Sequence, residues 1–263
     1  MGGRVERVGG RGRMRIAVLI TCHDRVVTTM VCLKRLFAAA ARLEGWSCKV
    51  FLVDDGSTDG TRGRVRAEFP GVHVIDGDGT LYWAKGMSLA WKTAAAERDW
   101  NAYLWLNDDT ELNEESLAQL MAANDGESVV VGELKNADGK IVYGLREGGL
   151  FTGNCVLVPR TVYERIGMIC GAYSHAWADS DYSMMAKRAG IDVVSAGVVG
   201  RAEGHPIRPN LKGLPFGTRM RLLRDPKGWN LHDLWLYRRR NWGYVAAIFS
   251  CLHLITHVVI GER

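Results

Sequence analysis

The amino-acid sequence predicts an α/β fold with a mostly parallel central sheet and helices on both faces. Short apolar runs rich in Val, Ile and Leu alternate with longer stretches in which apolar residues recur at helical spacing. The short runs are continuously apolar, as strands are when helices cover both faces of a sheet. The 263 residues, 47% of them hydrophobic and 24% charged, have the composition of a soluble globular protein and suffice for one large domain.

The first half of the chain is expected to alternate strictly between strands and helices. The strands are predicted at residues 15–21, 48–54, 71–76 and 102–107, and the helices at residues 26–44, 59–69 and 83–99. Later, the apolar runs at 128–134, 140–145 and 151–159 follow one another without long helices between them. The second half should therefore add a smaller mixed or antiparallel portion, followed by C-terminal helices.

The termini and the cysteines bear on the location of the protein. Residues 1–13 contain Gly and Arg but no apolar stretch, so they predict a disordered leader rather than a secretion signal. One short Arg-Gly segment does not indicate a nucleic-acid partner. The six cysteines form no CxxC pair, which argues against a zinc site or a disulfide framework. We therefore expect a cytoplasmic protein in a reduced environment.

Polar loops follow all four predicted strands of the first half. They read TCHDR (21–25), DDGSTDGT (54–61), DGDGT (76–80) and NDDT (107–110). Because open α/β sheets bind ligands beyond the carboxyl ends of their strands, we expect these loops to meet at one edge. Crowded carboxylates repel one another unless a cation relieves the repulsion, and oxygen ligands suit Mg²⁺ or Mn²⁺. The local alternative is an Asx-rich turn with no further role.

Five motifs in a fixed order make the sequence similar to the family 2 glycosyltransferases with the GT-A fold. AVLITCHDR resembles their first strand and nucleotide-contacting turn, FLVDDGSTDGT their second-strand motif, and LWLNDDT their metal-binding DXD position. GLFTGNCVLVPRTVYERIGMI is similar to the start of their acceptor half, and HAWADSDYSMMAKRAG to the helix that supplies the catalytic base. The resemblance runs from Met14 to Gly200, and GDGTLYWAKGMSLAW is typical of a bacterial branch that assembles surface polysaccharides.

The resemblance implies a division of labour along the chain. A catalytic domain is expected at residues 14–205, with a nucleotide-sugar-binding half at 14–110 and an acceptor half at 111–205. It implies an inverting, metal-dependent transfer of a sugar from a UDP- or dTDP-linked donor to a hydroxyl of a glycolipid or polysaccharide. The chemistry agrees, because a departing diphosphate needs a cation and the attacking hydroxyl needs a carboxylate to accept its proton.

The resemblance also implies donor and metal residues. Asp109, the last acid of the DXD position, is the expected ligand of Mn²⁺ or Mg²⁺. His205 is either a second metal ligand or a solvated loop residue. Asn107 departs from the family pattern, which has an acid there. Donor contacts are expected from Thr21, Arg25, Asp54, Asp55, Asp78, Lys85, Asn107 and Asp108, with a surface position as the alternative for the lysine.

Asp179 is the expected catalytic base, because it matches the second acid of the family's acidic pair at the start of a helix. Ala178 replaces the first acid of that pair, which makes Asp181 a competitor for the role. The structural alternative is that Asp179 caps the helix and Asp181 is favoured by the helix dipole. Further candidates for the acceptor side or for the core are Tyr82, Trp83, His175 and Trp177.

Residues 206–263 predict a helical extension rich in Arg and Trp. An interfacial helix on anionic lipid is the first interpretation, packing on the domain or on a dimer partner the second, and a membrane span the third. Residues 243–260 approach the length of a span, but two histidines and several Cys, Ser and Thr residues weigh against it. A peripheral position on the inner face of the plasma membrane follows.

Three other functions fit less of the sequence. A magnesium-dependent phosphatase or hydrolase usually carries its nucleophilic acid after the first strand, where this chain has TCHDR. A dinucleotide oxidoreductase needs GxGxxG at that position, and the sequence lacks it. A degenerate homologue that binds a nucleotide or glycan without turnover is compatible with Ala178 and Asn107. Release of a nucleoside diphosphate from the donor would exclude that alternative.

Overall fold

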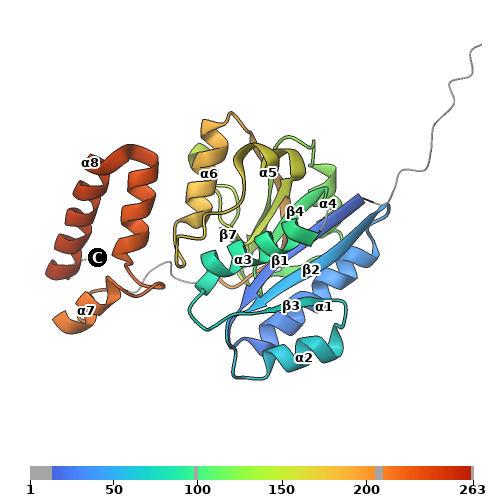
Figure 1. The fold of residues 1–263 in the computed structure, drawn as a ribbon, viewed down its shortest axis with the longest axis horizontal. Coiled ribbons are helices and arrows are strands. Elements are labelled where there is room, and N and C mark those ends of the chain that lie inside the picture. Colours follow the sequence, from blue (N-terminus) through green and yellow to red (C-terminus); the bar gives the residue numbers. More distant parts are fainter. Residues whose placement is uncertain (1–13, 98–99, 205–209, 262–263) are drawn as a thin grey trace, which may run out of the picture.

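The computed structural model describes residues 14–97, 100–204 and 210–261. One nine-stranded sheet forms its centre, in the order β3-β2-β1-β4-β8-β6-β9-β5 with β7 paired to β6 (Figure 1). The first four strands pair in parallel and coincide with the four strands predicted for the first half. They are β1 (Met14–Cys22), β2 (Trp46–Asp54), β3 (His73–Asp76) and β4 (Ala102–Leu106).

The second half of the chain extends the sheet with mixed pairing, as predicted. Its strands are β5 (Glu111–Leu112), β6 (Val129–Lys135), β7 (Ile141–Tyr143), β8 (Cys155–Pro159) and β9 (Val193–Arg201). Strand β8 runs antiparallel to both β4 and β6, whereas β6 and β9 are parallel. The short 3-10 turn η1 (Glu147–Gly149) precedes β8. The predicted fold class is confirmed.

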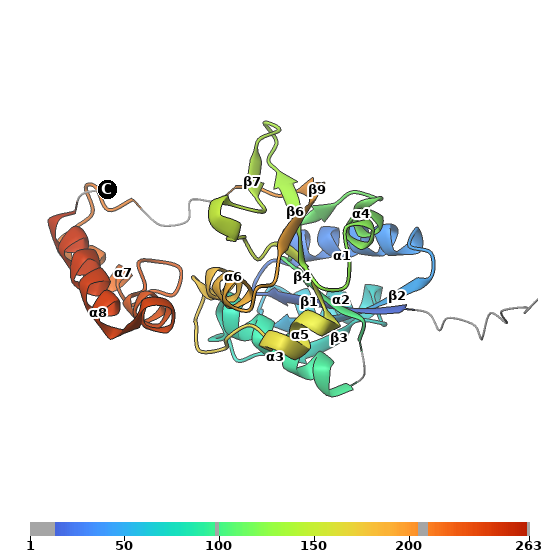
Figure 2. The same ribbon diagram turned by 90° about the horizontal axis from the view of Figure 1, so that it is seen from above.

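Helices cover both faces of the sheet (Figure 2). One face packs against α1 (Val26–Ala41), α2 (Thr61–Glu68) and α4 (Ser116–Ala122), and the other against α3 (Tyr82–Glu97), α5 (Arg160–Ile166) and α6 (Ala178–Arg188). Along β1, Ile16 and Val18 face the first layer while Ala17 and Leu19 face the second, and all four are fully buried. This two-sided burial explains why the strands read as unbroken apolar runs.

Aromatic side chains fill the layer under α3 and α6. Trp105 of β4 lies between Trp91 and Tyr182, with ring centroids 5.6 Å and 5.0 Å away. Edge-to-face packing of this kind adds to the free energy gained by burying the rings. The layer gives the site-bearing ends of β4 and α6 a common rigid support.

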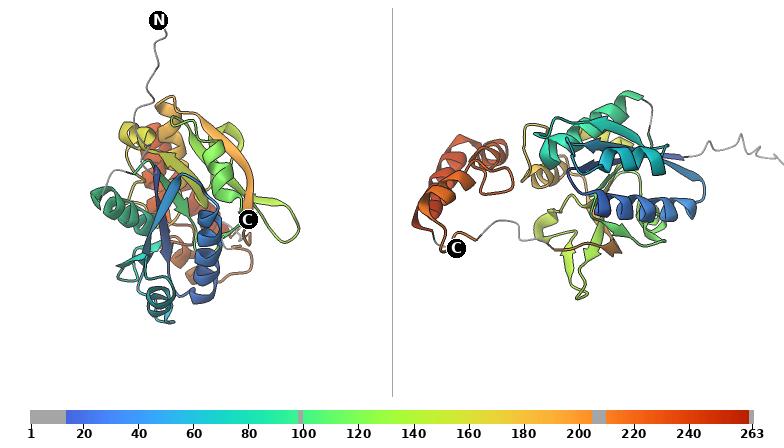
Figure 3. Two further views of the ribbon diagram at one scale, coloured as in Figure 1. Left: turned by 90° about the vertical axis from the view of Figure 1, so that its right-hand side faces the viewer. Right: turned by 90° about the horizontal axis from the view of Figure 1, so that it is seen from below.

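The C-terminal extension forms a separate helical layer beside α6 (Figures 1 and 3). It contains α7 (Phe216–Leu222) and α8 (Leu231–Ile260). Helix α8 is broken at Gly243, whose φ of 85° and ψ of −179° fold the second half back along the first. Such a conformation is essentially restricted to glycine. By length and composition α8 is the one described helix that could cross a membrane.

Candidate active site

The four polar loops do meet at one edge of the sheet. Parallel register places Cys22 opposite Asp54 and Asp54 opposite Asp76, so the carboxyl ends of β1, β2 and β3 coincide. The backbone N–H of Thr58 donates to Asp24 at 2.6 Å, which fastens the first loop to the second. The expectation that Asp55 and Asp109 share an edge is met, since both follow the carboxyl ends of strands in this parallel set.

The aspartates of DDGSTDGT organise the loops at this edge. Asp54 is fully buried, accepts a hydrogen bond from the Ser57 amide at 3.1 Å and pairs with Arg62 at 3.1 Å. Both carboxylate oxygens of Asp55 accept backbone N–H groups of the loop after β3. The donors are Gly79, Leu81 and Tyr82, at distances of 2.8 to 3.2 Å. Asp55 thus shapes the start of α3, and its expected contact with the nucleoside stays a prediction.

Arg25 bridges the two acids of the NDDT loop. Its Nη1 donates to Asp108 Oδ1 at 2.9 Å and to Asp109 Oδ2 at 3.0 Å. Asp108 is nearly buried, and its second oxygen lies 3.4 Å from the Thr29 hydroxyl. Burial raises the pKa of Asp108 to about 6, although Arg25 opposes that rise. The site therefore concentrates negative charge and holds one cationic side chain against it.

The donor atoms at this position suit a hard divalent cation. Asp109 Oδ1 is buried and has no hydrogen-bond partner among the described residues, so one carboxylate oxygen remains for a ligand. Within the described parts of the chain, no three His, Cys, Asp or Glu side chains form a metal-binding group. Diphosphate oxygens and water would have to complete the coordination, as is usual for Mg²⁺. His205 lies outside the described residues.

A chain of contacts connects the NDDT loop to the helix that carries Asp179. Asn107 Oδ1 accepts a hydrogen bond from Trp83 Nε1 at 2.7 Å. The Trp83 ring lies against Gly153, where a Cβ atom would come within 2.4 Å of it. The Gly153 amide in turn donates to Asp179 Oδ2 at 3.2 Å. Asn107, the residue that replaces an acid of the family pattern, thus orients an aromatic side chain between the two carboxylate sites.

Asp179 lies half-buried in the first turn of α6. Burial raises the pKa of its carboxyl group, against hydrogen bonds from the Ser180 and Gly153 amides. Trp177, directly before this helix, adopts a left-handed φ of 72°. Positive φ is uncommon for a bulky residue and is found more often at functional sites. The structure thus brings a carboxylate with raised proton affinity to the same edge as the Arg25 group.

Asp181 has a different environment from Asp179. It is buried, and its two oxygens accept hydrogen bonds from Arg240 Nε and Asn241 Nδ2 of α8, each at 2.9 Å. A second buried acid, Asp233 of the extension, accepts the backbone N–H groups of Ser174 and His175 at 3.0 to 3.1 Å. The first half of α8 therefore holds the segment that leads into Asp179.

The remaining predicted residues take several positions. Thr21 is buried against α3, where a Cβ on Gly86 would come 2.3 Å from its hydroxyl. Asp78 is exposed, and hydrogen bonds from Thr80 lower its pKa. Lys85 is half-buried and lies near Asp78. In a separate part of the site, burial lowers the pKa of His175 to about 4. Tyr82 has a positive φ of 54° at the start of α3.

Sequence reasoning did not single out the residues that hold the site together. Gly153 and Asp233 lie in quoted or predicted segments, but their roles depend on contacts with distant parts of the chain, whereas Arg62 pairs with Asp54 only eight residues away. The position of Asp233 in the first turn of a helix could have been predicted from its neighbours in the sequence. The Asn230 side chain caps α8 by accepting the Asp233 amide at 2.9 Å, and an Asn with an acid three residues later is a recognisable helix start.

Comparisons with known proteins agree with this geometry. Residues 17–173 match the family model described as glycosyl transferase family 2. Mannosyltransferase PcManGT from Pyrobaculum calidifontis, in complex with GDP-Man and Mn²⁺, has a similar fold with a TM-score of 0.55 at 18% identity, covering 95% of this chain and 77% of that one. S. aureus TarS 1-349 in complex with UDP-GlcNAc gives a TM-score of 0.55 at 15% identity, covering 90% and 73%. No curated protein matched the chain.

Proposed function

The chain belongs to glycosyl transferase family 2, and from this premise we propose that it transfers a sugar from a nucleoside-diphosphate donor with inversion at the sugar carbon. One observation carries the proposal. The Asn107–Trp83–Gly153–Asp179 contacts join the Arg25–Asp108–Asp109 group to a second, separate carboxylate at the same sheet edge. A single-displacement transfer needs two such centres, one for the leaving diphosphate and one for the attacking hydroxyl.

The NDDT loop is assigned to the diphosphate. Asp109 Oδ1, which is buried and lacks a partner among the described residues, would hold a divalent cation together with diphosphate oxygens. The cation would stabilise the negative charge that develops on the leaving group. Arg25 is 40% exposed and bonded to both acids, so its guanidinium is within reach of an incoming diphosphate. The nucleotide-sugars bound by the two similar structures support a donor of this class.

Asp179 is assigned as the base. Its raised pKa favours acceptance of a proton from the acceptor hydroxyl, and it still makes no ion pair among the described residues. Asp181 is assigned a structural role, because Arg240 and Asn241 already occupy both of its oxygens. The acceptor is proposed to be a glycolipid or polysaccharide that reaches the site from the side of α6 and the C-terminal extension.

The test compares Asp179→Asn with the matched variant Asp181→Asn. Donors of the UDP, dTDP and GDP classes are first screened by thermal shift with and without Mn²⁺, because a bound ligand stabilises the native state. With the best donor, Asp179→Asn should lower turnover at least about a thousandfold while donor affinity changes little, since the lost interaction belongs to the transition state. Asp181→Asn should chiefly lower the melting temperature. Near-normal turnover of Asp179→Asn would refute the assignment.

A further inference from the structure

The second half of α8, residues 244–260, is apolar on two opposite faces. One face packs into a small core of the extension through Cys251, Leu254 and Val258, and Ala247 on the same face is fully buried. The opposite face, here called the outer face, is exposed and consists of Val245, Ile248, Phe249, Leu252, Val259 and Ile260. Val245 and Phe249 are each 68% exposed.

A helix in contact with water normally carries polar residues on its solvent side. The outer face is mostly apolar, because its six apolar members recur at helical spacing and only His253 and Thr256 interrupt them; the Thr256 hydroxyl already donates to the Leu252 carbonyl at 3.0 Å. Contiguous exposed apolar surface of this kind marks an interaction site rather than ordinary surface variation. Something apolar must therefore cover the outer face in the working protein.

The charge around the outer face identifies the partner. Residues 210–261 contain eight Lys or Arg and two Asp, a net charge of +6, which exceeds the +5 of the whole chain. At the Gly243 bend, Arg238 lies over the Trp242 ring at 5.0 Å and Arg239 over the Tyr244 ring at 5.8 Å. Exposed Trp and Tyr beside Arg, at the border of an apolar stripe, are typical of the lipid–water interface.

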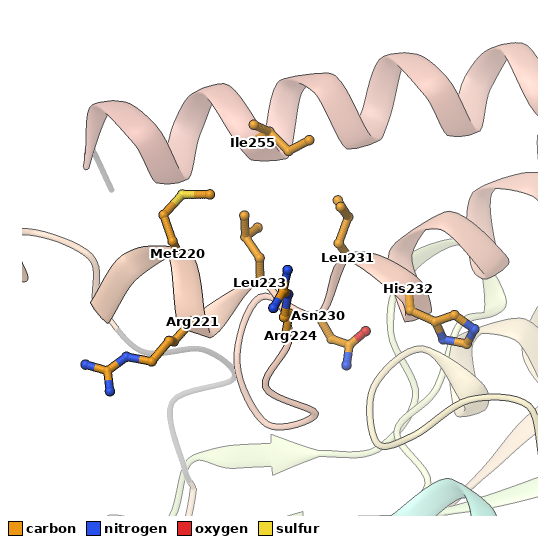
Figure 4. A pocket seen from close by; sticks show the side chains of 8 residues that line it. All are labelled: Met220, Arg221, Leu223, Arg224, Asn230, Leu231, His232 and Ile255. Carbon is orange, nitrogen blue, oxygen red and sulfur yellow. The ribbon is translucent and has the colours of Figure 1, made fainter. Parts of the chain in front are cut away.

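The space between α7 and α8 also combines apolar side chains with arginines (Figure 4). A pocket of about 640 Å³ opens there, lined by the apolar side chains of Met220, Leu223, Leu231 and Ile255. Arg221 and Arg224 also line it; in Figure 4 the Arg221 side chain points away from the apolar side chains, and the Arg224 guanidinium lies beside Leu223 and Leu231. An apolar floor with a cationic edge fits an amphiphile that has an anionic headgroup.

We propose that the outer face of residues 244–260 lies in the interfacial layer of a membrane rich in anionic lipid. The proposal rests on the proposed function and names the surface to which the acceptor is attached. A second copy of the chain fits less well, because two patches of charge +6 would repel each other. A span also fits less well, because the helix after Gly243 is about 25 Å long against a hydrocarbon core of about 30 Å.

Docking of this surface would orient the active site. The first half of α8 is fastened to the segment before Asp179 through Asp233 and Ser174, and Tyr237 stacks on Trp177 with ring centroids 4.7 Å apart. Residues that contact the membrane and residues that lead into the base therefore belong to one connected element. Docking of the outer face would therefore bring the segment that carries Asp179 close to the layer in which a lipid-linked acceptor resides.

The test is flotation of the full chain with vesicles. Phosphatidylcholine vesicles are compared with vesicles that also contain phosphatidylglycerol, for the wild type and for the double variant Phe249→Glu/Leu252→Glu. We expect preferential binding to the anionic vesicles, weakened by high salt, and a loss of more than about tenfold in the double variant. Ile141→Glu is the matched control, because Ile141 in β7 and Leu252 are both 55% exposed. This control should bind like the wild type.

Two outcomes would overturn the proposal. One is unchanged vesicle binding by the double variant. The other is absence of vesicle binding together with a dimer that light scattering detects and that the double variant dissociates, which would assign the outer face to a second copy. Circular dichroism of each variant confirms that it is folded. Vesicle binding needs no sugar donor, so a protein that binds vesicles but transfers no sugar would refute the proposed function alone.

Discussion

At the scale of single residues, the site contains charges and backbone conformations that lower the stability of the folded protein. Asp108 and Asp109 carry like charges on one loop, and only the Arg25 guanidinium compensates them among the described residues. Tyr82 and Trp177 hold positive φ angles, which an aromatic residue adopts at a cost of about 1–2 kcal/mol. Such costs are tolerated where they place functional groups.

Asp109→Ala tests the cation assignment. Removing this carboxylate should abolish the increase in donor affinity that Mn²⁺ produces, because the buried oxygen that would bind the cation is gone. Titration calorimetry of the donor with and without Mn²⁺ measures the effect. Asp138→Ala, which removes an exposed acid from a turn, is the control and should behave like the wild type. Undiminished metal-dependent affinity in Asp109→Ala would place the ligand elsewhere.

Asp108→Asn should make the protein more stable above pH 6. The folded-state pKa of Asp108 is raised from 3.8 to about 6 by burial, so the native state binds the proton more tightly than the unfolded chain. The cost of ionising this buried group is absent below about pH 4, grows between pH 4 and 6 and is complete above that range. Urea unfolding should show a gain on the order of 2 kcal/mol at pH 7.5 that vanishes at pH 4. An equal difference at both pH values would refute this origin.

At the scale of elements, the parallel strands could be predicted, whereas the contacts that assemble the site could not. Continuous apolar runs such as β1 identify buried strands because burial on both faces leaves that pattern in the sequence. The bonds from Asp55 to the loop before α3, and from Asn107 to Trp83, join residues that are more than 20 positions apart. Such long-range hydrogen bonds cannot be predicted from the residues on either side of each partner. Likewise the break at Gly243 was not predicted, since a single glycine within an apolar helix is often tolerated.

Asp233→Ala should loosen the segment that leads into Asp179. The amides of Ser174 and His175 lose their acceptor, and leaving such groups unpaired costs about 1–3 kcal/mol each. Hydrogen exchange at these two amides should speed up by at least about a hundredfold. His232→Ala removes an exposed ring whose Nδ1 lies 3.1 Å from Asp233 Oδ1, and it should leave their exchange nearly unchanged because the carboxylate still accepts both amides. Equal exchange in both variants would show that α8 does not hold this segment.

At the scale of the whole molecule, the protein combines a rigid catalytic sheet with a helical layer, of which, among the described residues, only the first half of α8 packs into the core of the sheet. The sheet is covered by two continuous cores, whereas the extension has a small core of its own around Leu223 and Leu254. Polar contacts join the parts, among them Arg240 with Asp181 and Asp233 with the Ser174 segment, and the first half of α8 also packs Leu236 and Tyr237 into the core under α3 and α6. Regions with little buried apolar surface open at lower free energy than the central core.

Native-state hydrogen exchange should therefore resolve two levels of stability. Amides of residues 244–260 should exchange through an opening of lower free energy than amides of β1, whose side chains are almost entirely buried. Anionic vesicles should slow exchange in residues 244–260 and leave β1 unaffected. Identical opening free energies in both regions without vesicles would mean that the extension and the sheet unfold as one unit.

The conformation of Gly243 decides whether α8 is two shorter helices folded against each other or one long straight helix. With its present φ of 85° and ψ of −179°, the chain reverses, and the apolar half of α8 lies antiparallel to the basic half. Were that position helical, the 30 residues of α8 would form one rod of about 45 Å, with Arg238, Arg239 and Arg240 before a long apolar run. Basic residues at one end of such a run are the hallmark of an integral anchor. Gly243→Ala disfavours the bend and favours the rod by about 1 kcal/mol, so one methyl group would shift the balance from the proposed surface-bound form toward a membrane-spanning form.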